Sequence, residues 1–311
     1  MVAGRLSDLS SGSAALLWYN PDGSLDPSFS DDGKLVYPTR ELLTDVAIQT
    51  DGKILALANV IITRFDSDGT TDRSFGNNGS ATTFTGDVSI SVSNAVTLQP
   101  DGKIIVAGQS NNKFAVARYN ANGSLDPTFS GDGVVTTSSG ANSDFAYDVA
   151  VQADGKIVIS GTSYFSSPNR REFAFVRYNP NGELDPTFDG DGIVRHFVPG
   201  SYENSAASLA IQPDGKIVAA GYTAANETRT DVAVWRYLGG GNEPTARRAA
   251  FDFDGDGKSD IAVFRPADGV WYQLRSTEGF TAAQFGLSTD RLAPADYDGD
   301  GKTDLAVFRD G

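Results

Sequence analysis

The sequence predicts an all-β fold, a β-propeller built from four-stranded antiparallel blades. A repeated unit is marked by Arg64, Arg118, Arg177 and Arg236, which lie 54, 59 and 59 residues apart. This period is too long for helical hairpins and suits a four-stranded blade with loop insertions. Within each unit, side chains alternate with the period of two that is typical of a strand. Asn-Gly and Asp-Gly pairs separate the strand-like runs, as in hairpin turns.

The best copy of the unit begins at Phe114 and reads FAVARYNANGSLDPTFSGDGVV, with DVAVQADGKIVISG following from Asp148. Residues 114–119 alternate between two faces that are both largely apolar, as expected for a sheet that packs between neighbouring sheets. Asn122-Gly123 and Asp154-Gly155 are predicted turns, because Gly adopts positive φ at no steric cost. A single strand at 231–237 follows four full units, at residues 14–58, 60–108, 114–161 and 173–221.

Polar residues that recur once per unit are interpreted as structural. We expect the strand Arg to bond either the Asp of the Leu-Asp-Pro step or a turn carbonyl, and that Asp to cap a turn. The recurring aspartates are Asp26, Asp126 and Asp185, with Asp72 equivalent. The same interpretation applies to the glutamines before each DGK turn, which are Gln49, Gln99, Gln152 and Gln212.

The unit resembles the delta-60 repeat of bacterial surface and secreted proteins. Its RYN-x-(D/N)G, LDP-x-F and DGKI-x-(V/A)(A/S)G steps are all present, over residues 2–238. The resemblance implies a β-propeller and brings no known activity or catalytic residues with it. The first copy departs from the pattern with Trp18 in place of the Arg and Ala58 in place of the closing Gly. The second copy has Arg73 in place of the Pro.

A Gly-rich and Pro-containing stretch at 239–248 is the predicted boundary between residues 1–238 and a second module at 249–311, since three glycines and a proline specify no strand or helix. Beyond it, DFDGDGKSDIAVFRP from Asp252 and DYDGDGKTDLAVFR from Asp296 form a second repeat with a period of 44 residues. Because the second copy is truncated, we expect the chain to be a fragment of a longer repeat array.

Each copy of the second repeat opens with a predicted calcium loop. Four aspartates occupy positions 1, 3, 5 and 9, and such a cluster of carboxylates repels itself unless a cation neutralises it. Ca²⁺ takes six to eight oxygen ligands in a flexible shell, whereas Mg²⁺ demands tighter octahedral geometry. A lysine carbonyl at position 7 would complete each set. The predicted ligands are Asp252, Asp254, Asp256, Lys258 and Asp260 in the first loop, and Asp296, Asp298, Asp300, Lys302 and Asp304 in the second.

An EF-hand shares the opening of this loop but needs a bidentate Glu at position 12 and flanking helices. Here Val263 and Val307 stand at position 12, within strand-like runs. The loops instead resemble the FG-GAP or VCBS repeats of integrin α-chain-like propellers, over residues 249–311. Phe285-Gly286 stands at the FG step and 269–272 forms an inner strand. The resemblance implies calcium held between strands, where it would staple a hairpin; the alternative is that the aspartates only form turns.

The amino-acid composition argues against several classes of binding partner and of site. Lys and Arg total 25 against 40 Asp and Glu, and this net charge of −15 disfavours nucleic acid and anionic membranes. The chain has no Cys, which excludes thiolate sites, and a single His, His196, which is predicted to lie in a strand. No stretch approaches the roughly 18 to 20 apolar residues that span a bilayer, so no membrane insertion is expected.

We therefore expect a non-enzymatic, calcium-stabilised β-propeller of a secreted or cell-surface bacterial protein, serving adhesion, recognition or scaffolding. Its ligand would be a protein or a glycan, with Tyr164, Phe165 and Tyr202 as conceivable contacts. Two alternatives stay open. One is a propeller enzyme, a glycosidase or lyase that works with two carboxylates. The other is a structural spacer in a large surface protein.

Overall fold

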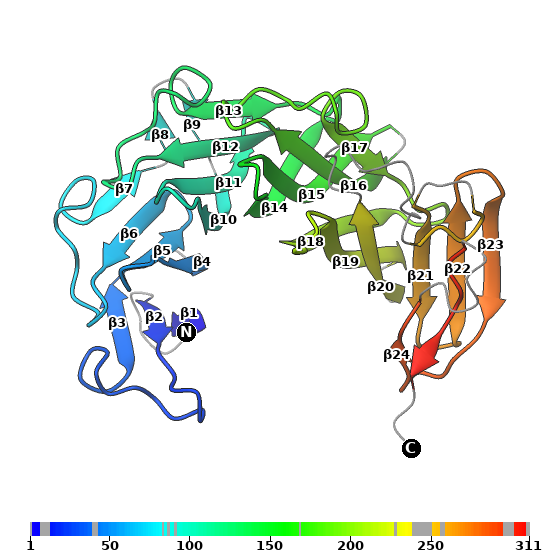
Figure 1. Cartoon of the computed structure of the whole chain (residues 1–311), viewed down its shortest axis with the longest axis horizontal. Helices are drawn as coiled ribbons and strands as arrows, with labels where there is room; N and C mark the ends of the chain where they lie inside the picture. Colours follow the sequence, from blue (N-terminus) through cyan, green and yellow to red (C-terminus); the bar gives the residue numbers. More distant parts are fainter. Residues whose placement is uncertain are drawn as a thin grey trace. The chain divides into compact units, whose positions relative to one another are not determined.

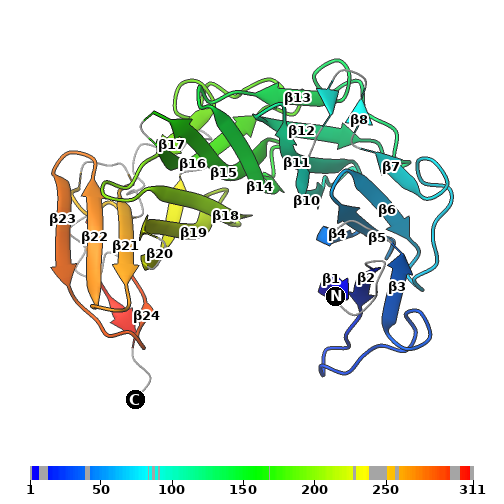
Figure 2. The same cartoon turned by 180° about the vertical axis from the view of Figure 1, so that it is seen from behind.

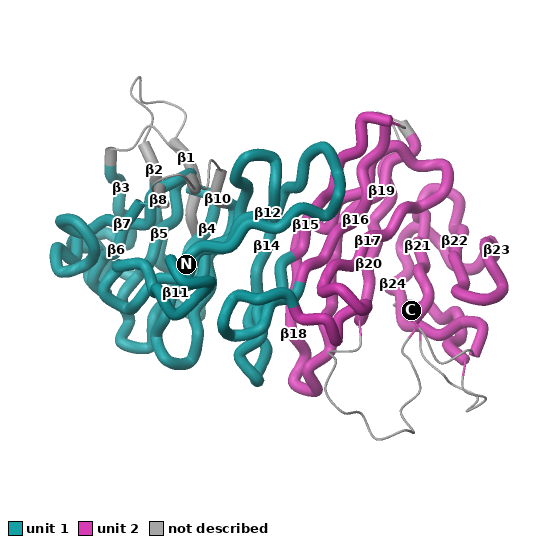
Figure 3. The backbone as a smooth tube through the Cα atoms, turned by 90° about the horizontal axis from the view of Figure 1, so that it is seen from above, with its two compact units in different colours: residues 1–159, 177–184 teal, residues 160–176, 185–311 magenta. Residues whose placement is uncertain are grey.

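The computed structural model describes residues 2–6, 13–38, 43–82, 84–85, 88–89, 92–167, 169–226, 229–237, 251–255, 259–294 and 302–308. Strands are the regular structure of these residues, as the all-β prediction requires (Figures 1 and 2). The chain divides into two compact units, shown in Figure 3. The first comprises residues 1–159 and 177–184, and the second comprises 160–176 and 185–311.

Consecutive strands form antiparallel meanders. A three-stranded sheet contains β1 (Val2–Leu6), β2 (Ser13–Leu17) and β3 (Lys34–Pro38). The next sheet contains β4 (Leu43–Ile48), β5 (Ile54–Ala58), β6 (Ile61–Phe65) and β7 (Ser80–Thr82). After the ribbon of β8 (Phe84–Thr85) and β9 (Val88–Ser89), a sheet contains β10 (Val92–Leu98), β11 (Ile104–Ser110), β12 (Lys113–Tyr119) and β13 (Val134–Thr137).

Longer strands follow. One four-stranded sheet contains β14 (Ser143–Val151), β15 (Ile157–Ser166), β16 (Asn169–Tyr178) and β17 (Ile193–His196). A six-stranded sheet contains β18 (Glu203–Ile211), β19 (Ile217–Asn226), β20 (Arg229–Tyr237), β21 (Ile261–Arg265), β22 (Val270–Arg275) and β23 (Gly279–Gln284). The last described strands are β24 (Arg291–Leu292) and β25 (Val307–Phe308).

The structure adds two details to the repeat prediction. The predicted strand at 231–237 lies in β20, which pairs with β19 along most of its length and with β21 at residues 232–234. The predicted unit boundaries also fall inside sheets: the unit at 114–161, for example, takes β12 and β13 from one sheet and β14 and β15 from the next. Periodicity defines the length of a repeat but not its starting point. The structural unit begins with the strand before each DGK turn.

A β-bulge recurs at one repeat position, opposite the closing residue of the unit. The first strand of a sheet shifts register between Leu43 and Asp45, between Ser93 and Ala95, and between Ala206 and Ser208. A bulge bends the strand locally and increases its twist. Opposite the third bulge, a Cβ added to Gly221 would lie 1.8 Å from the carbonyl oxygen of Ser205, so only Gly fits there. Ala58 stands at this position in the first copy and pairs with Leu43 beside the same type of bulge.

The apolar residues of the first unit pack between adjacent sheets. One core cluster joins Leu57 and Ile62 of the β4–β7 sheet to Val106 and Ala117 of the β10–β13 sheet. Tyr119 is 1% exposed and its hydroxyl donates to the carbonyl of Thr82 at 3.1 Å. Both faces of these strands are therefore buried, as the sequence predicts.

Candidate metal centre

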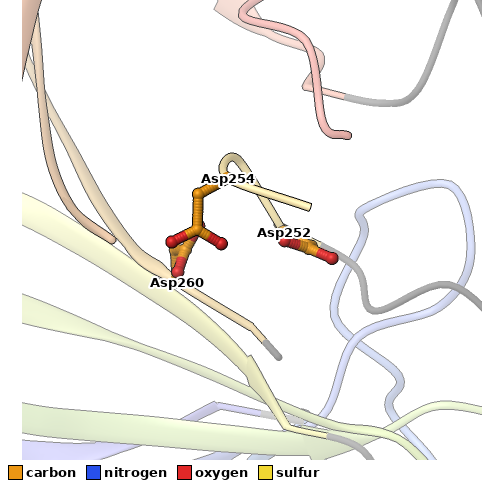
Figure 4. Close-up of side chains that lie close together, drawn as sticks. All are labelled: Asp252, Asp254 and Asp260. Carbon is orange, nitrogen blue, oxygen red and sulfur yellow. The ribbon is translucent and has the colours of Figure 1, made fainter. Parts of the chain in front are cut away.

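The first aspartate loop precedes β21 and gathers three carboxylates. Asp252, Asp254 and Asp260 each offer an oxygen atom, and these atoms all lie within 4.8 Å of one another (Figure 4). The three residues are 2%, 9% and 7% exposed, respectively. The loop thus brings together the first, second and fourth of its predicted carboxylate ligands. Asp256 and Lys258 lie outside the described residues.

Main-chain groups hold the loop in this conformation. The amide of Phe253 donates to Oδ2 of Asp260 at 2.7 Å, and the amide of Gly255 donates to Oδ1 of Asp252 at 2.6 Å. The amide of Asp260 donates to the carbonyl of Phe251 at 2.7 Å, which closes the loop just before β21 begins. Gly255 has φ +82°, a conformation that Gly adopts without strain.

The turn between β22 and β23 donates hydrogen bonds to two of these carboxylates. The amide of Ser276 donates to Oδ1 of Asp260 at 2.8 Å. The amide and hydroxyl of Thr277 donate to Oδ2 of Asp254 at 2.9 and 2.7 Å, and the amide of Glu278 donates to the same atom at 3.3 Å. Sequence reasoning missed these residues. Short polar residues before Gly279 mark a turn, but only strand pairing shows which carboxylates the turn meets.

The electrostatics of the cluster disfavour three negative charges. Burial raises the pKa of Asp260 above its ordinary value, and the neighbouring carboxylates of Asp254 and Asp252 raise it further. Amide hydrogen bonds from Ser276 and Phe253 oppose this rise without cancelling it. A bound cation would relieve the repulsion. The donor set is entirely carboxylate oxygen, which is the chemistry that Ca²⁺ prefers, so these residues fit the ion.

Part of the second loop lies beside the first. A Cβ added to Gly255 would be 3.1 Å from Cε of Lys302, so the lysine side chain covers that glycine. The amide of Thr303 donates to the carbonyl of Asp252 at 2.6 Å. Asp304 follows, ahead of β25. Asp296, Asp298 and Asp300 lie outside the described residues, so the structure does not test the second set of ligands.

The element that follows the first loop is a strand, as predicted. Ile261–Arg265 forms β21 directly after the first loop, and the inner strand expected at 269–272 corresponds to β22. Gly286 of the FG step has φ +115°, and a Cβ there would contact Phe264 and Val307. An EF-hand requires helices on both sides of its loop, so this loop is of another type.

The other residues singled out in the sequence have structural partners. Arg171 lies over the ring of Tyr164, and Arg170 lies over the ring of Phe165. Tyr202 is 37% exposed.

The single histidine, His196, lies in β17 as predicted and stacks on Tyr237 with 5.7 Å between ring centroids. Burial lowers the pKa of His196 to about 4, so the ring is neutral near pH 7.

Two of the recurring arginines, Arg118 and Arg64, have the expected partners. The Nε of Arg118 donates to Asp126 at 2.7 Å, and one of its terminal nitrogens donates to the carbonyl of Pro180 at 2.5 Å. Arg64 bonds Asp72 and the carbonyl of Ala121 in the same way. Each arginine therefore has both predicted partners, and the turn carbonyl belongs to the following repeat.

No helix among the described residues is long and apolar enough to cross a bilayer.

Comparisons with solved structures returned propeller proteins of low identity. A protein of unknown function from Bacteroides caccae is 14% identical with a TM-score of 0.44, over 91% of this chain and 89% of that chain. A catalytically inactive virginiamycin B lyase from Staphylococcus aureus, solved with quinupristin, is 14% identical with a TM-score of 0.40, over 98% and 92%. The Pan2 WD40 domain of Neurospora crassa is 11% identical with a TM-score of 0.44, over 85% and 69%. Likenesses at this level carry no conclusion about activity.

No curated protein matches the sequence. Two family models do. The model described as a domain of unknown function (DUF5122) beta-propeller matches residues 1–29, 99–129, 152–188 and 212–242. The model described as an FG-GAP-like repeat matches residues 252–307. Both matches fall on the segments that carry the sequence motifs, and they confirm the predicted fold class. The chain therefore carries β-propeller repeats of the DUF5122, delta-60 type followed by an FG-GAP-like repeat.

Proposed function

We propose that this protein is a non-enzymatic, calcium-stabilised β-propeller of a secreted or cell-surface bacterial protein, used for adhesion, recognition or scaffolding. The observation that carries the proposal is the convergence of Asp252, Asp254 and Asp260 within 4.8 Å. FG-GAP repeats are typical of extracellular proteins, where millimolar calcium would populate even weak sites. The net charge of −15 suits a cation-rich setting.

The ion would cross-link the aspartate loop to neighbouring elements. Asp252 and Asp260 bracket the loop, and Asp254 is bonded to the β22–β23 turn through Thr277. A cation bound by all three would tie the loop to β21 and, through Asp254 and Asp260, to that turn. We propose that Asp256 and the carbonyl of Lys258 complete the shell. We also propose a second site formed by Asp296, Asp298, Asp300, Lys302 and Asp304.

A thermal melt with EDTA and then with added CaCl₂ tests the metal. A site with a dissociation constant of about 10⁻⁴ M would add about 1.4 kcal/mol to the free energy of unfolding at 1 mM calcium, or a few degrees in Tm. Calorimetric titration should detect the binding directly, with weaker binding of Mg²⁺.

A matched pair of variants locates the site. Asp260→Asn should abolish the calcium-dependent rise in Tm, since it removes a central carboxylate. Asp154→Asn is the control, because Asp154 stands in a DGK turn of the first repeat and its side chain is 53% exposed. If EDTA leaves the melt unchanged and titration shows no calcium binding, the metal proposal fails.

A carboxylate enzyme is the competing class. Burial raises the pKa of Asp45, and nearby Asp148 raises it further. However, Asp45 accepts amide hydrogen bonds from Val46 and Val96, both at 2.8 Å, and Asp148 accepts one from Val149 at 2.8 Å. The pair occupies one repeat position and caps backbone amides, which favours a structural role. Release of p-nitrophenol from p-nitrophenyl glycosides, lost in Asp45→Asn, would instead support the enzyme.

A further inference from the structure

A small cavity of about 200 Å³ is lined by residues of the six-stranded sheet and includes none of the aspartates of the first loop. Its floor is formed by strands β19 to β23, and its wall is the loop at residues 198–201. The wall is fixed: the Asn204 side chain is fully buried and donates to Oγ of Ser201 at 2.7 Å. The same Asn204 amide donates to the carbonyl of Arg171 at 2.7 Å. The cavity is therefore preformed.

A charge pair lies in the floor of this cavity. Asp231 in β20 and Arg265 in β21 adjoin the paired residues Val232 and Phe264, and Nε of Arg265 donates to both carboxylate oxygens of Asp231 at 2.9 Å. A third bond, from Nη2, measures 2.8 Å. Asp231 is 7% exposed. Because Arg265 is paired with Asp231 and also lies 3.5 Å from the carboxylate of Asp268, an anionic ligand would find no unpaired cation here.

Two aromatic side chains line the cavity next to Arg265, whose guanidinium lies 4.5 Å from the centroid of the Tyr272 ring. The rings of Tyr272 and Phe280 stack at 27° with 6.2 Å between centroids. The hydroxyl of Tyr272 accepts a hydrogen bond from Nη1 of Arg265 at 2.8 Å, which links the ring to the charge pair. Phe280 is 59% exposed, so its ring is open to a ligand. A ligand that covered its ring would gain apolar contact.

We infer that this cavity binds one ring of a neutral sugar within a glycan. A pyranose has an apolar face for Phe280 and a rim of hydroxyl groups for the paired Asp231 and Arg265, which still have unused lone pairs and N–H groups. The volume admits a single ring. This inference rests on the proposed recognition function and names its partner class.

The probe is a panel of methyl glycosides of neutral hexoses and pentoses, with methyl glucuronide as a charged comparator. Saturation-transfer NMR and calorimetric titration, in buffer with 1 mM CaCl₂, measure binding. At least one neutral glycoside should bind with a dissociation constant on the order of 1 mM, as expected for so small a ligand. Methyl glucuronide should bind no better.

Variants of exposed aromatic residues then locate the site. Phe280→Ala should weaken binding about tenfold, whereas Phe280→Trp should retain it. Phe285→Ala is the matched control, since Phe285 is 46% exposed and does not line the cavity. Melting curves confirm that each variant folds.

The inference is overturned if no neutral glycoside binds, if methyl glucuronide binds best, or if Phe280→Ala binds as well as the unchanged protein. Its failure is separable from that of the calcium proposal, which the melt in EDTA tests alone. Turnover of a glycoside would contradict the non-enzymatic assignment.

Discussion

At the scale of single residues, the recurring Arg joins one repeat to the next. Arg118 bonds Asp126 and the carbonyl of Pro180, and its guanidinium lies 4.8 Å from the centroid of the Phe129 ring. Although burial raises the pKa of Asp126, hydrogen bonds from Thr128 and the charge of Arg118 hold it below its ordinary value. Both groups are therefore ionised and largely excluded from solvent; the Arg118 side chain is 7% exposed and that of Asp126 is 3% exposed.

The first copy shows what replaces this pair. Trp18 stands at the position of the Arg, and its ring lies 5.7 Å from that of Phe29, the counterpart of Phe129. The corresponding Asp26 binds the amide and hydroxyl of Ser28. An aromatic contact thus takes the place of the cation–π contact, while the turn cap is retained.

Arg118→Met should lower the free energy of unfolding by about 3–5 kcal/mol, because it leaves the buried carboxylate of Asp126 without its counter-charge. Urea unfolding followed by circular dichroism measures the loss. The control is Lys34→Met, which removes an exposed pair with Asp32 at 3.9 Å and should cost less than about 1 kcal/mol. If the two substitutions lowered the free energy of unfolding equally, the buried pair would contribute no more to stability than the exposed pair.

At the scale of elements, hydrogen bonds alone tie the hairpin of β22 and β23 to the aspartate loop. Four hydrogen bonds reach Asp254 and Asp260 from residues 276–278. The loop and turn are 16 to 24 residues apart in sequence, and the antiparallel register of β21, β22 and β23 brings them together. The hairpin therefore positions the site as much as the loop does.

Thr277→Val should cost about 1.5–3 kcal/mol in EDTA, since it removes the hydroxyl that donates to the Asp254 carboxylate at 2.7 Å. Thermal unfolding in EDTA measures this, and calcium affinity should fall in parallel because Asp254 is less well oriented. Thr281→Val in β23 is the control. If both variants melt alike in EDTA, the bond from Thr277 is not a stabilising tie.

At the scale of the whole molecule, each compact unit is an array of antiparallel sheets whose contacts are mostly between neighbours. In such arrays stability is close to a sum of local terms, so a ligand stabilises chiefly the repeats that it touches. The proposed calcium contacts all lie in the second unit.

Hydrogen exchange should therefore respond to calcium locally. Chelation by EDTA should reduce the protection of amides in β21 to β23, above all at residues 276–278, and leave β10 to β13 unchanged. Exchange followed by mass spectrometry, with and without CaCl₂, measures both regions in one sample. A uniform change in amide protection across β10 to β23 would contradict a local effect of calcium.

Much of this architecture follows from the sequence alone. Alternation of apolar residues, Gly at positive φ in the DGK turns and the 44-residue spacing of the aspartate loops are local or periodic properties, which a linear pattern records directly. The ties of Arg118 and Arg64 were predictable for the same reason, because a residue that recurs with its turn serves the repeat.

Only the tertiary structure decided the phase of the repeats, the pairing of β20 with β21, the turn at 276–278 and the cavity beside Phe280. Each depends on strands that are distant in sequence meeting at a particular register, and a linear pattern does not specify register between unlike repeats. The sequence therefore determined which residues can hold a cation or a turn, and the register of the six-stranded sheet decided which of them meet.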